Sequence, residues 1–233
     1  MIRRTLTIPK GMILQISDEI GALFPDLVVG VLEGPVVNSE GNAELWGMIH
    51  SVSQRIKSTM DAEAIRQLDG IRMGKQAYRR LGKDPNRYRL SAEALMRRIV
   101  KGQELYAINT VVDVLNLVSL QSGITIGGFD SGLVDGFVEL GIGRAGEEFE
   151  AIGRGMLNVE DLPVYRDRSG AIGNPTSDCM RTRITLSTST VLMLITGFYG
   201  TESIGEVLES LAGLLGRYCQ GGPFGTAIIK KEQ

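Results

Sequence analysis

The sequence predicts an α+β protein in which mixed, largely antiparallel sheets pack against helices. Apolar residues recur at three- and four-residue spacing through most of the first half of the 233-residue chain, which is typical of amphipathic helices. After Gly123 the apolar runs become short and are separated by glycines, which is typical of strands joined by turns. Helices and strands do not alternate regularly, so a repeating βαβ array is not expected.

The length of the chain fits one large domain, or two interleaved lobes that meet near residues 123–130. Hydrophobic residues make up 43 % and charged residues 22 % of the chain, which excludes wholesale disorder. No run of eighteen apolar residues is present, and the start MIRRTLTIPKG lacks the apolar stretch of a signal peptide. We therefore expect no membrane partner and a cytoplasmic location.

The first elements along the chain are short. Residues 6–8 alternate as in a strand, and a second strand is expected from Val28 until the Gly-Pro pair at 34–35 breaks the apolar run. Between these strands, Ser17 is expected to cap a short helix that ends before Pro25.

Four helices are expected next. The first follows Asn38 and Ser39, because apolar residues recur at helical spacing over residues 45–56, and the second covers residues 61–81. The third is SAEALMRRIVKG, which Ser91 can cap and which ends at Gly102. The fourth is TVVDVLNLVSLQSG, with Asn109 as its cap and Gly123 as its C-terminal stop.

Six segments after this helix are expected to be strands or strand–turn units. They are residues 124–129, 133–142, 149–153, 162–167, 182–188 and 191–200. Helical spacing returns over residues 201–218, where Thr201 or Ser203 can act as the cap and Arg217 complements the helix dipole. Residues 226–230 can pair as an edge strand.

Several classes of site have no support in the sequence. Cys179 and Cys219 have no neighbouring histidine, so no metal site is expected. The glycine-rich stretches contain neither GxGxxG between a strand and a helix nor GxxxxGK[ST], so we expect no nucleotide cofactor and no other cofactor. His50 lies on an amphipathic helix and is interpreted as a surface or packed residue, because nothing near it indicates a Ser-His-Asp or Cys-His hydrolase.

Charge is distributed unevenly along the chain. Residues 72–101 contain ten basic and two acidic residues and carry +8, whereas the remainder, with 15 basic and 25 acidic residues, carries −10. A basic segment on an acidic protein is suited to a phosphate backbone, and Tyr78 and Tyr88 within it could stack on unpaired bases. The alternative is a solvated surface whose arginines pair with carboxylates elsewhere. The RNA-binding candidates are Arg79, Arg80, Lys83, Arg87, Arg89, Arg97 and Arg98.

A known family is indicated by residues 105–130, which read LYAINTVVDVLNLVSLQSGITIGGFD. The stretch resembles the signature of the editing domain, called B3/B4, in the β chain of bacterial phenylalanyl-tRNA synthetase. The matching positions are Asn109, Val111-Val112-Asp113, Asn116, Gly123 and Phe129-Asp130. Residues 146–178 resemble the second half of that domain, and Thr182, Ile184 and Thr188 resemble its closing pattern.

This resemblance implies a single B3/B4-like domain over residues 1–233, a free-standing homologue of the editing domain and not a complete tRNA ligase. The family's domain hydrolyses the ester of tyrosine wrongly attached to the phenylalanine tRNA. The resemblance therefore implies tRNA or aminoacyl-tRNA as a partner and a trans-acting deacylase as the activity. A positioned water and backbone N–H groups that stabilise the oxyanion suffice for such a hydrolysis.

The resemblance also suggests where the substrate pocket lies. The pocket candidates are Gly127, Gly128, Asp178 and Thr182, because glycines permit close backbone approach and a buried carboxylate can recognise a substrate hydroxyl. Asn109, Asp113 and Asn116 share one helical face and are interpreted as support for the pocket wall. No catalytic residue can be assigned from the sequence.

Two features of the sequence depart from the family signature: Thr110 stands in place of its second asparagine, and Gly127 in place of its histidine. The second departure keeps an alternative open, a non-catalytic module that holds tRNA or a free amino acid. A third hypothesis is a protein-interaction scaffold. The sequence leaves the amino acid, the tRNA and the oligomeric state open.

Overall fold

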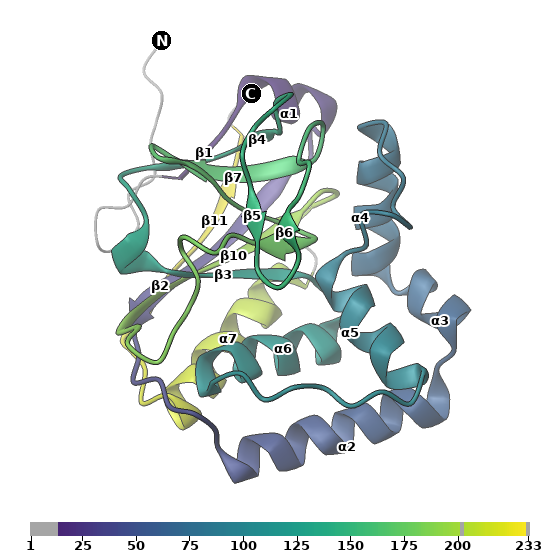
Figure 1. The fold of residues 1–233 in the computed structure, drawn as a ribbon, viewed down its shortest axis with the longest axis vertical. Helices are drawn as coiled ribbons and strands as arrows, with labels where there is room; N and C mark the ends of the chain where they lie inside the picture. The colour runs from purple at the N-terminus through teal and green to yellow at the C-terminus, as the bar shows by residue number, and fades with distance from the viewer. Residues whose placement is uncertain (1–13, 201–202, 232–233) are drawn as a thin grey trace.

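The structure is a computed structural model that describes residues 14–200 and 203–231. Figure 1 shows α2 to α7 gathered below and to one side of the sheets, whereas α1 lies at the top. The helices are α1 (Asp18–Leu23), α2 (Ala43–Thr59), α3 (Ala62–Gln67), α4 (Asp69–Arg80), α5 (Ser91–Val100), α6 (Thr110–Ser122) and α7 (Ile204–Tyr218), with a 3-10 turn η1 (Ser131–Leu133).

The strands form two principal sheets and a small hairpin. Their bounds are β1 (Leu14–Ile16), β2 (Val28–Pro35), β3 (Ile126–Asp130), β4 (Val138–Ile142), β5 (Glu150–Ala151), β6 (Gly155–Met156), β7 (Pro163–Asp167), β8 (Gly170–Asn174), β9 (Ser177–Asp178), β10 (Thr190–Gly197) and β11 (Gly225–Lys230). The strand orders are β1-β4-β7-β8-β9 and β11-β2-β10-β3, and β5 pairs with β6. All of these pairs are antiparallel except β1 with β4, so the predicted α+β class with largely antiparallel sheets is confirmed.

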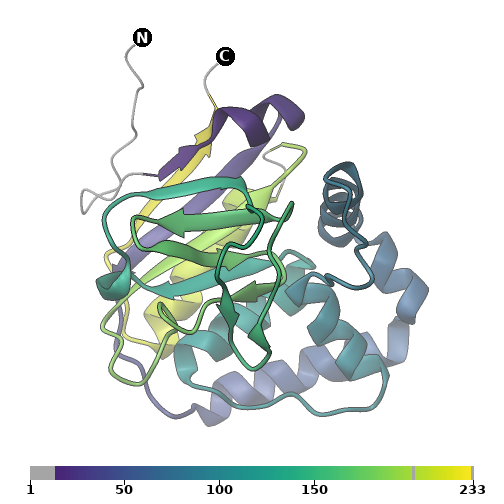
Figure 2. The same ribbon diagram turned by 45° about the horizontal axis from the view of Figure 1, so that its top comes forward.

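The four-stranded sheet is the middle layer of the fold, as Figure 2 shows from a second direction. Side chains alternate along β10, because successive residues of a strand point to opposite faces. Val191, Met193 and Ile195 belong to the core shared with the helices, whereas Leu192 and Leu194 belong to the core shared with the five-stranded sheet. Both faces of β10 are therefore buried, which explains its uninterrupted apolar sequence.

Local signals in the sequence located several elements correctly. The Ser17 hydroxyl accepts the N–H of Ile20 at the start of α1, and the Asn109 side chain accepts the N–H of Val112 at the start of α6. Gly123 ends α6 with φ at 71°, a left-handed conformation that glycine adopts without strain. The expected edge strand is β11, at one end of its sheet.

The helix predicted over residues 61–81 is two helices, and that prediction is wrong at Leu68. Leu68 has φ at −58° and ψ at 131°, which ends α3 and starts α4 in a new direction. The first turn of α4 then lies against the end of α6: a Cβ atom at Gly70 would lie 2.7 Å from the carbonyl oxygen of Gly123. A tertiary contact determines the break.

Helix α2 follows Asn38 and Ser39 as predicted, and its cap is Asn42, whose side chain accepts the N–H of Leu45. The start of α5 differs from the prediction. Ser91 is the first residue of α5 and not its cap, and its N–H donates to the carbonyl of Pro175 at 2.9 Å. Ser91 is therefore bound to a neighbouring segment of the fold and does not cap its own helix.

Among the predicted strands, residues 182–188 form turns. Their hydroxyl groups bond locally, as when the Thr188 Oγ1 accepts the N–H of Thr185 at 2.9 Å, and such bonds compete with a sheet. The strand from Val28 is not broken at 34–35 but continues through Pro35, which pairs with Thr190. The strand expected at residues 6–8 and the cap expected at Thr201 lie outside the described residues, and Ser203 makes no side-chain capping bond.

Candidate functional site

Two segments that are far apart in the sequence meet where the two principal sheets face each other. Asp178 lies on β9, the last strand of the five-stranded sheet, and Gly127 and Gly128 lie on β3, the last strand of the other. The N–H of Gly128 donates to the Asp178 Oδ2 at 3.1 Å. Three of the four predicted pocket residues are therefore brought together.

Glycine is needed on both sides of the Asp178 carboxyl group. A Cβ atom at Gly173 would lie 2.6 Å from the ring of Phe129 and 2.9 Å from the Asp178 Oδ1, which leaves no room for a side chain. A Cβ atom at Gly127 would lie 3.1 Å from the same ring and 3.3 Å from the same oxygen. The fully buried Phe129 ring thus lies over the position where the family signature has histidine.

The Asp178 carboxyl group has few hydrogen-bond partners to offset the cost of its burial. The N–H of Gly128 is its single hydrogen-bond donor among the described residues. Burial raises the pKa of Asp178 from 3.8 to about 7, and the bond from Gly128 opposes this shift only in part. Such a group exchanges protons near neutral pH, as a general base or acid requires.

Tyr165 lies near this carboxyl group and contacts a residue that lines a cavity. Its hydroxyl lies 2.7 Å from the Oγ1 of Thr196. Burial, and to a smaller extent the charge of Asp178, raise the pKa of the Tyr165 hydroxyl, which therefore stays protonated at neutral pH. Thr196 itself lines the cavity.

The cavity has a volume of about 280 Å³ and lies where the helices meet the open end of the two sheets. Its walls come from the first turn of α4, the start of α5, the end of α6, the end of β10 and the start of α7. Thr125, Pro175 and Thr196 line it, whereas Gly127, Gly128, Asp178 and Thr182 do not. The sequence prediction missed Thr125, although it lies two residues before Gly127 and alternation along an extended segment places it on the same face.

Helices α4 and α5 hold the loop that carries Asp178. The buried hydroxyls of Tyr78 on α4 and Thr176 in the loop lie 2.9 Å apart, and the N–H of Ser91 on α5 donates to Pro175. Within the loop, Asn174 accepts the N–H groups of Thr176 and Ser177. These N–H groups, like that of Gly128, are engaged and are not free to bind an oxyanion.

Thr182 is fully buried beside the end of β3. Its carbonyl accepts the N–H of Asp130 at 2.9 Å, while its Oγ1 has no hydrogen-bond partner among the described residues. The carboxylate of Asp130 accepts the hydroxyl of Thr188 at 2.7 Å. Thr182 thus fastens the end of β3 through its backbone.

The three residues predicted to support the pocket wall, Asn109, Asp113 and Asn116, do not line the cavity. Asn109 caps the helix, and Asp113 accepts the indole N–H of Trp46 at 2.8 Å and the N–H of Ile108 at 3.2 Å. Burial raises the pKa of Asp113, against the effect of these two bonds. Asn116 is half-buried. Asp113 joins α6 to α2 about 14 Å along the helix from Ser122, the α6 residue that lines the cavity.

About half of the basic residues of segment 72–101 pair with carboxylates. Arg72 pairs with Asp69, Lys83 with Asp161, and Lys75, Arg89 and Arg97 surround Glu93. Within residues 14–200 and 203–231, five have no carboxylate oxygen within 4 Å. They are Arg79, Arg80, Arg87, Arg98 and Lys101.

The two tyrosines of this segment cannot stack on bases, which corrects the prediction. Tyr78 is fully buried, and Tyr88 is 7 % exposed and covered by Lys83 and Arg87. Tyr106, which the sequence prediction missed, is 68 % exposed and lies 4.2 Å from the guanidinium of Arg98. It is the aromatic side chain that the basic surface presents to solvent.

The possible metal ligands, the thiols and the histidine do not gather into a common site in the described part of the chain. No three His, Cys, Asp or Glu residues there gather closely enough to hold a metal ion. Cys179 and Cys219 are free thiols. His50 is exposed on α2 and its ring packs on Trp46 at 5.5 Å between centroids. No helix in this part is long and apolar enough to cross a membrane.

These observations define an α+β domain with two principal sheets, a protonatable carboxyl group on β9 and a separate cavity among the helix and strand ends. The family model described as B3/4 domain matches residues 74–206, more than half of the chain. The protein therefore belongs to the B3/4 domain family, as the signature at residues 105–130 predicts.

Among solved structures, the chain is similar to an N-terminal fragment of the phenylalanyl-tRNA synthetase β-subunit from Pyrococcus horikoshii, with 13 % identity and a TM-score of 0.47. The match covers 94 % of this chain and 54 % of the other, so the chain spans about half the length of that fragment. No curated protein matches the sequence.

Proposed function

We propose that this protein is a trans-acting deacylase of mischarged aminoacyl-tRNA. The observation that carries the proposal is the carboxyl group of Asp178, whose pKa of about 7 suits a general base. Asp178 lies three residues after Pro175, which lines a cavity of a size that can accommodate an amino-acid side chain. Membership in the B3/4 family supports the same chemistry. The proposal concerns ester hydrolysis and not aminoacylation.

In the proposed reaction, Asp178 removes a proton from a water molecule, and the resulting hydroxide attacks the carbonyl carbon of the ester. The bond between that carbon and the ribose oxygen then breaks, and the protonated Asp178 returns the proton to the departing oxygen. The products are the free amino acid and tRNA. Because Asp178 has one hydrogen-bond donor, its Oδ1 is available to the water.

The basic surface supports tRNA as the carrier of the ester. Helix α4 and Leu90, the residue before α5, line part of the cavity. The same two helices carry Arg79, Arg80 and Arg98, which have no carboxylate partner among the described residues. An RNA backbone bound along these helices would bring its end toward the cavity. Each arginine close to a phosphate releases counterions and so contributes to affinity.

Purified protein incubated with tRNAs charged with tyrosine and with other non-cognate amino acids tests the proposal. The measured quantity is the ester that remains with time, compared with buffer alone and with the Asp178→Asn variant. We expect wild-type protein to consume at least one charged tRNA, at a rate that rises with pH through about 7. If no charged tRNA is lost faster than in buffer, the deacylase proposal fails.

A second candidate is a non-catalytic module that binds tRNA or a free amino acid. It is favoured by Gly127, which stands where the family signature has histidine and therefore offers no side chain for catalysis, and by the Phe129 ring, which lies 3.1 Å from the position of a Cβ atom there. In the same assay such a module would bind charged tRNA and leave the ester intact. A protein-interaction scaffold would either not bind tRNA or bind it with an affinity that does not change between low and moderate salt.

A further inference from the structure

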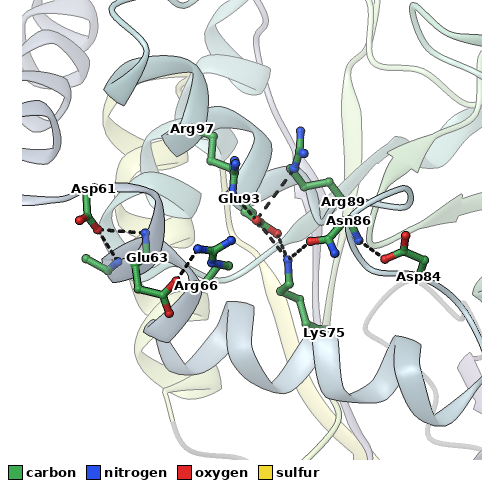
Figure 3. Close-up of polar contacts among 10 residues, drawn as sticks. Asp61, Glu63, Arg66, Lys75, Asp84, Asn86, Arg89, Glu93 and Arg97 are labelled. Atoms are coloured by element: carbon green, nitrogen blue, oxygen red, sulfur yellow. Dashed lines mark hydrogen bonds and ion pairs between the residues drawn. The ribbon is translucent and has the colours of Figure 1, made fainter.

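An ionic cluster with a buried centre lies between α4, α5 and the loop before α5, and it contains more cations than anions. Figure 3 shows Lys75 from α4, Arg97 from α5 and Arg89 from the loop before α5 converging on Glu93. The Lys75 Nζ lies 3.2 and 3.1 Å from the two Glu93 oxygens, and the Arg97 NH1 lies 3.3 Å from the Glu93 Oε1. We call these four residues the Glu93 cluster.

The charge of the Glu93 cluster is not balanced by its surroundings. Three cations around one carboxylate leave a net charge of +2, while the side chains of Glu93 and Lys75 are 0 % and 4 % exposed. Asn86, the remaining partner of Lys75, is neutral. The nearby Glu63 is paired with Arg66, and Asp84 accepts the N–H of Asn86 (Figure 3). A desolvated excess of positive charge is unfavourable unless an anion approaches it.

The Nε–H group of Arg89 is a hydrogen-bond donor without an acceptor among the described residues. The Nε atom is buried and lies 3.9 Å from the Glu93 Oε1, beyond hydrogen-bond distance. An unpaired buried donor is unfavourable, so it indicates an absent acceptor. The rest of the side chain remains reachable, because 37 % of the Arg89 and 20 % of the Arg97 side chain is exposed.

We propose that Arg89 and Arg97 form a binding site for a phosphate group, with Lys75 and Glu93 behind them. Glu93 fixes the position of the Arg97 guanidinium group. Lys75 neutralises the charge of Glu93, so that this carboxylate does not repel the phosphate. Planar guanidinium groups bind the oxygens of phosphate through paired N–H donors, which suits two partly exposed arginines with a shared anchor. The phosphate comes either from an RNA backbone or from a free phosphomonoester. The proposal does not depend on ester hydrolysis.

Titration with inorganic phosphate at constant ionic strength, followed by the ³¹P resonance, tests the site. We expect saturable binding to wild-type protein and binding at least about tenfold weaker in Arg89→Gln and Arg97→Gln, since tenfold corresponds to loss of one charged hydrogen bond. Arg72→Gln is the matched control, because Arg72 belongs to the same basic segment but pairs with the exposed Asp69. Circular dichroism verifies that each variant folds.

Competition with RNA distinguishes the two sources of phosphate. If inorganic phosphate binds and displaces a short RNA duplex in proportion to its occupancy, the group belongs to an RNA backbone. If phosphate binds and RNA affinity does not change, a phosphomonoester is the ligand. Absence of saturable phosphate binding, or equal binding by wild type, Arg89→Gln and Arg97→Gln, overturns the proposal. Phosphate binding without deacylation leaves this inference intact while the proposed function fails.

Discussion

Asp178 and Glu93 are both carboxyl groups withdrawn from water, but the fold surrounds them differently. Asp178 has a single backbone N–H for a partner, whereas Glu93 has Lys75 and Arg97 within hydrogen-bond distance and Arg89 close by. Burial therefore raises the pKa of Asp178 to about 7, and the cations at Glu93 hold a fixed ionic structure. The two groups differ in their partners: Asp178, with one weakly compensating N–H, exchanges protons near neutral pH, whereas Glu93 anchors the cations around it.

The largest expected effect comes from removing the acid–base group. Asp178→Asn should lower the deacylation rate by about 10²- to 10⁴-fold, because an amide cannot accept a proton from water. The affinity for tRNA should not change, since the arginines are untouched. The measurement is single-turnover hydrolysis of charged tRNA, with Asp26→Asn, an exposed aspartate, as the control. Equal rates for wild type and Asp178→Asn would remove Asp178 from the mechanism.

The next effect concerns the anchoring carboxylate. Glu93→Gln should destabilise the protein by roughly 3–5 kcal/mol, because it leaves the buried ammonium of Lys75 without a counter-charge. The free energy of unfolding from urea titration measures this loss. Glu44→Gln, which breaks the exposed pair with Arg217, should cost at most about 1 kcal/mol. If Glu93→Gln and Glu44→Gln lowered the free energy of unfolding by similar amounts, the buried pair would be no more important for stability than the exposed one.

The raised pKa of Asp178 also predicts how stability depends on pH. The folded state binds the Asp178 proton more tightly than the unfolded state does, so this group stabilises the fold at low pH and loses that contribution as pH rises through about 7. Between pH 5 and pH 8, wild-type protein should lose roughly 2–3 kcal/mol relative to Asp178→Asn. Parallel pH profiles of unfolding for the two proteins would show that the pKa of Asp178 is ordinary.

The smallest predicted effect concerns the link between α4 and the Asp178 loop. Tyr78→Phe should destabilise the protein by about 1–2 kcal/mol, because it leaves the buried hydroxyl of Thr176 without its partner. Tyr106→Phe, at a side chain that is 68 % exposed, is the matched control and should have almost no effect. Urea unfolding compares the two. A neutral Tyr78→Phe substitution would mean that the loop is held without this bond.

The sequence was most informative where a feature depends on neighbouring residues. The caps at Ser17 and Asn109 and the stop at Gly123 were predicted because each satisfies backbone groups within one turn. The break at Leu68 was missed because it depends on the close approach of Gly70 to Gly123. The turns at residues 182–188 were taken for a strand because their apolar and polar residues alternate.

The candidate site shows the same division. Residues 105–130 indicate the family and include Gly127 and Gly128, and Asp178 lies at the end of the second stretch that resembles the family, residues 146–178. The cavity residues Thr125 and Thr196 were not predicted, because they come together only when the end of β10 and the residue before β3 meet.

By itself, the sequence determined the α+β class, the family, the local helix caps and the excess of ten basic over two acidic residues in segment 72–101. Only the tertiary structure decided that Tyr78 and Tyr88 are buried, which arginines surround Glu93, and that Asp178 lies beside Gly128 with one donor. The physical reason is that a cap or a net charge follows from residues close in sequence. Burial and hydrogen-bond partners, which set a pKa, come from segments that meet only in the folded chain.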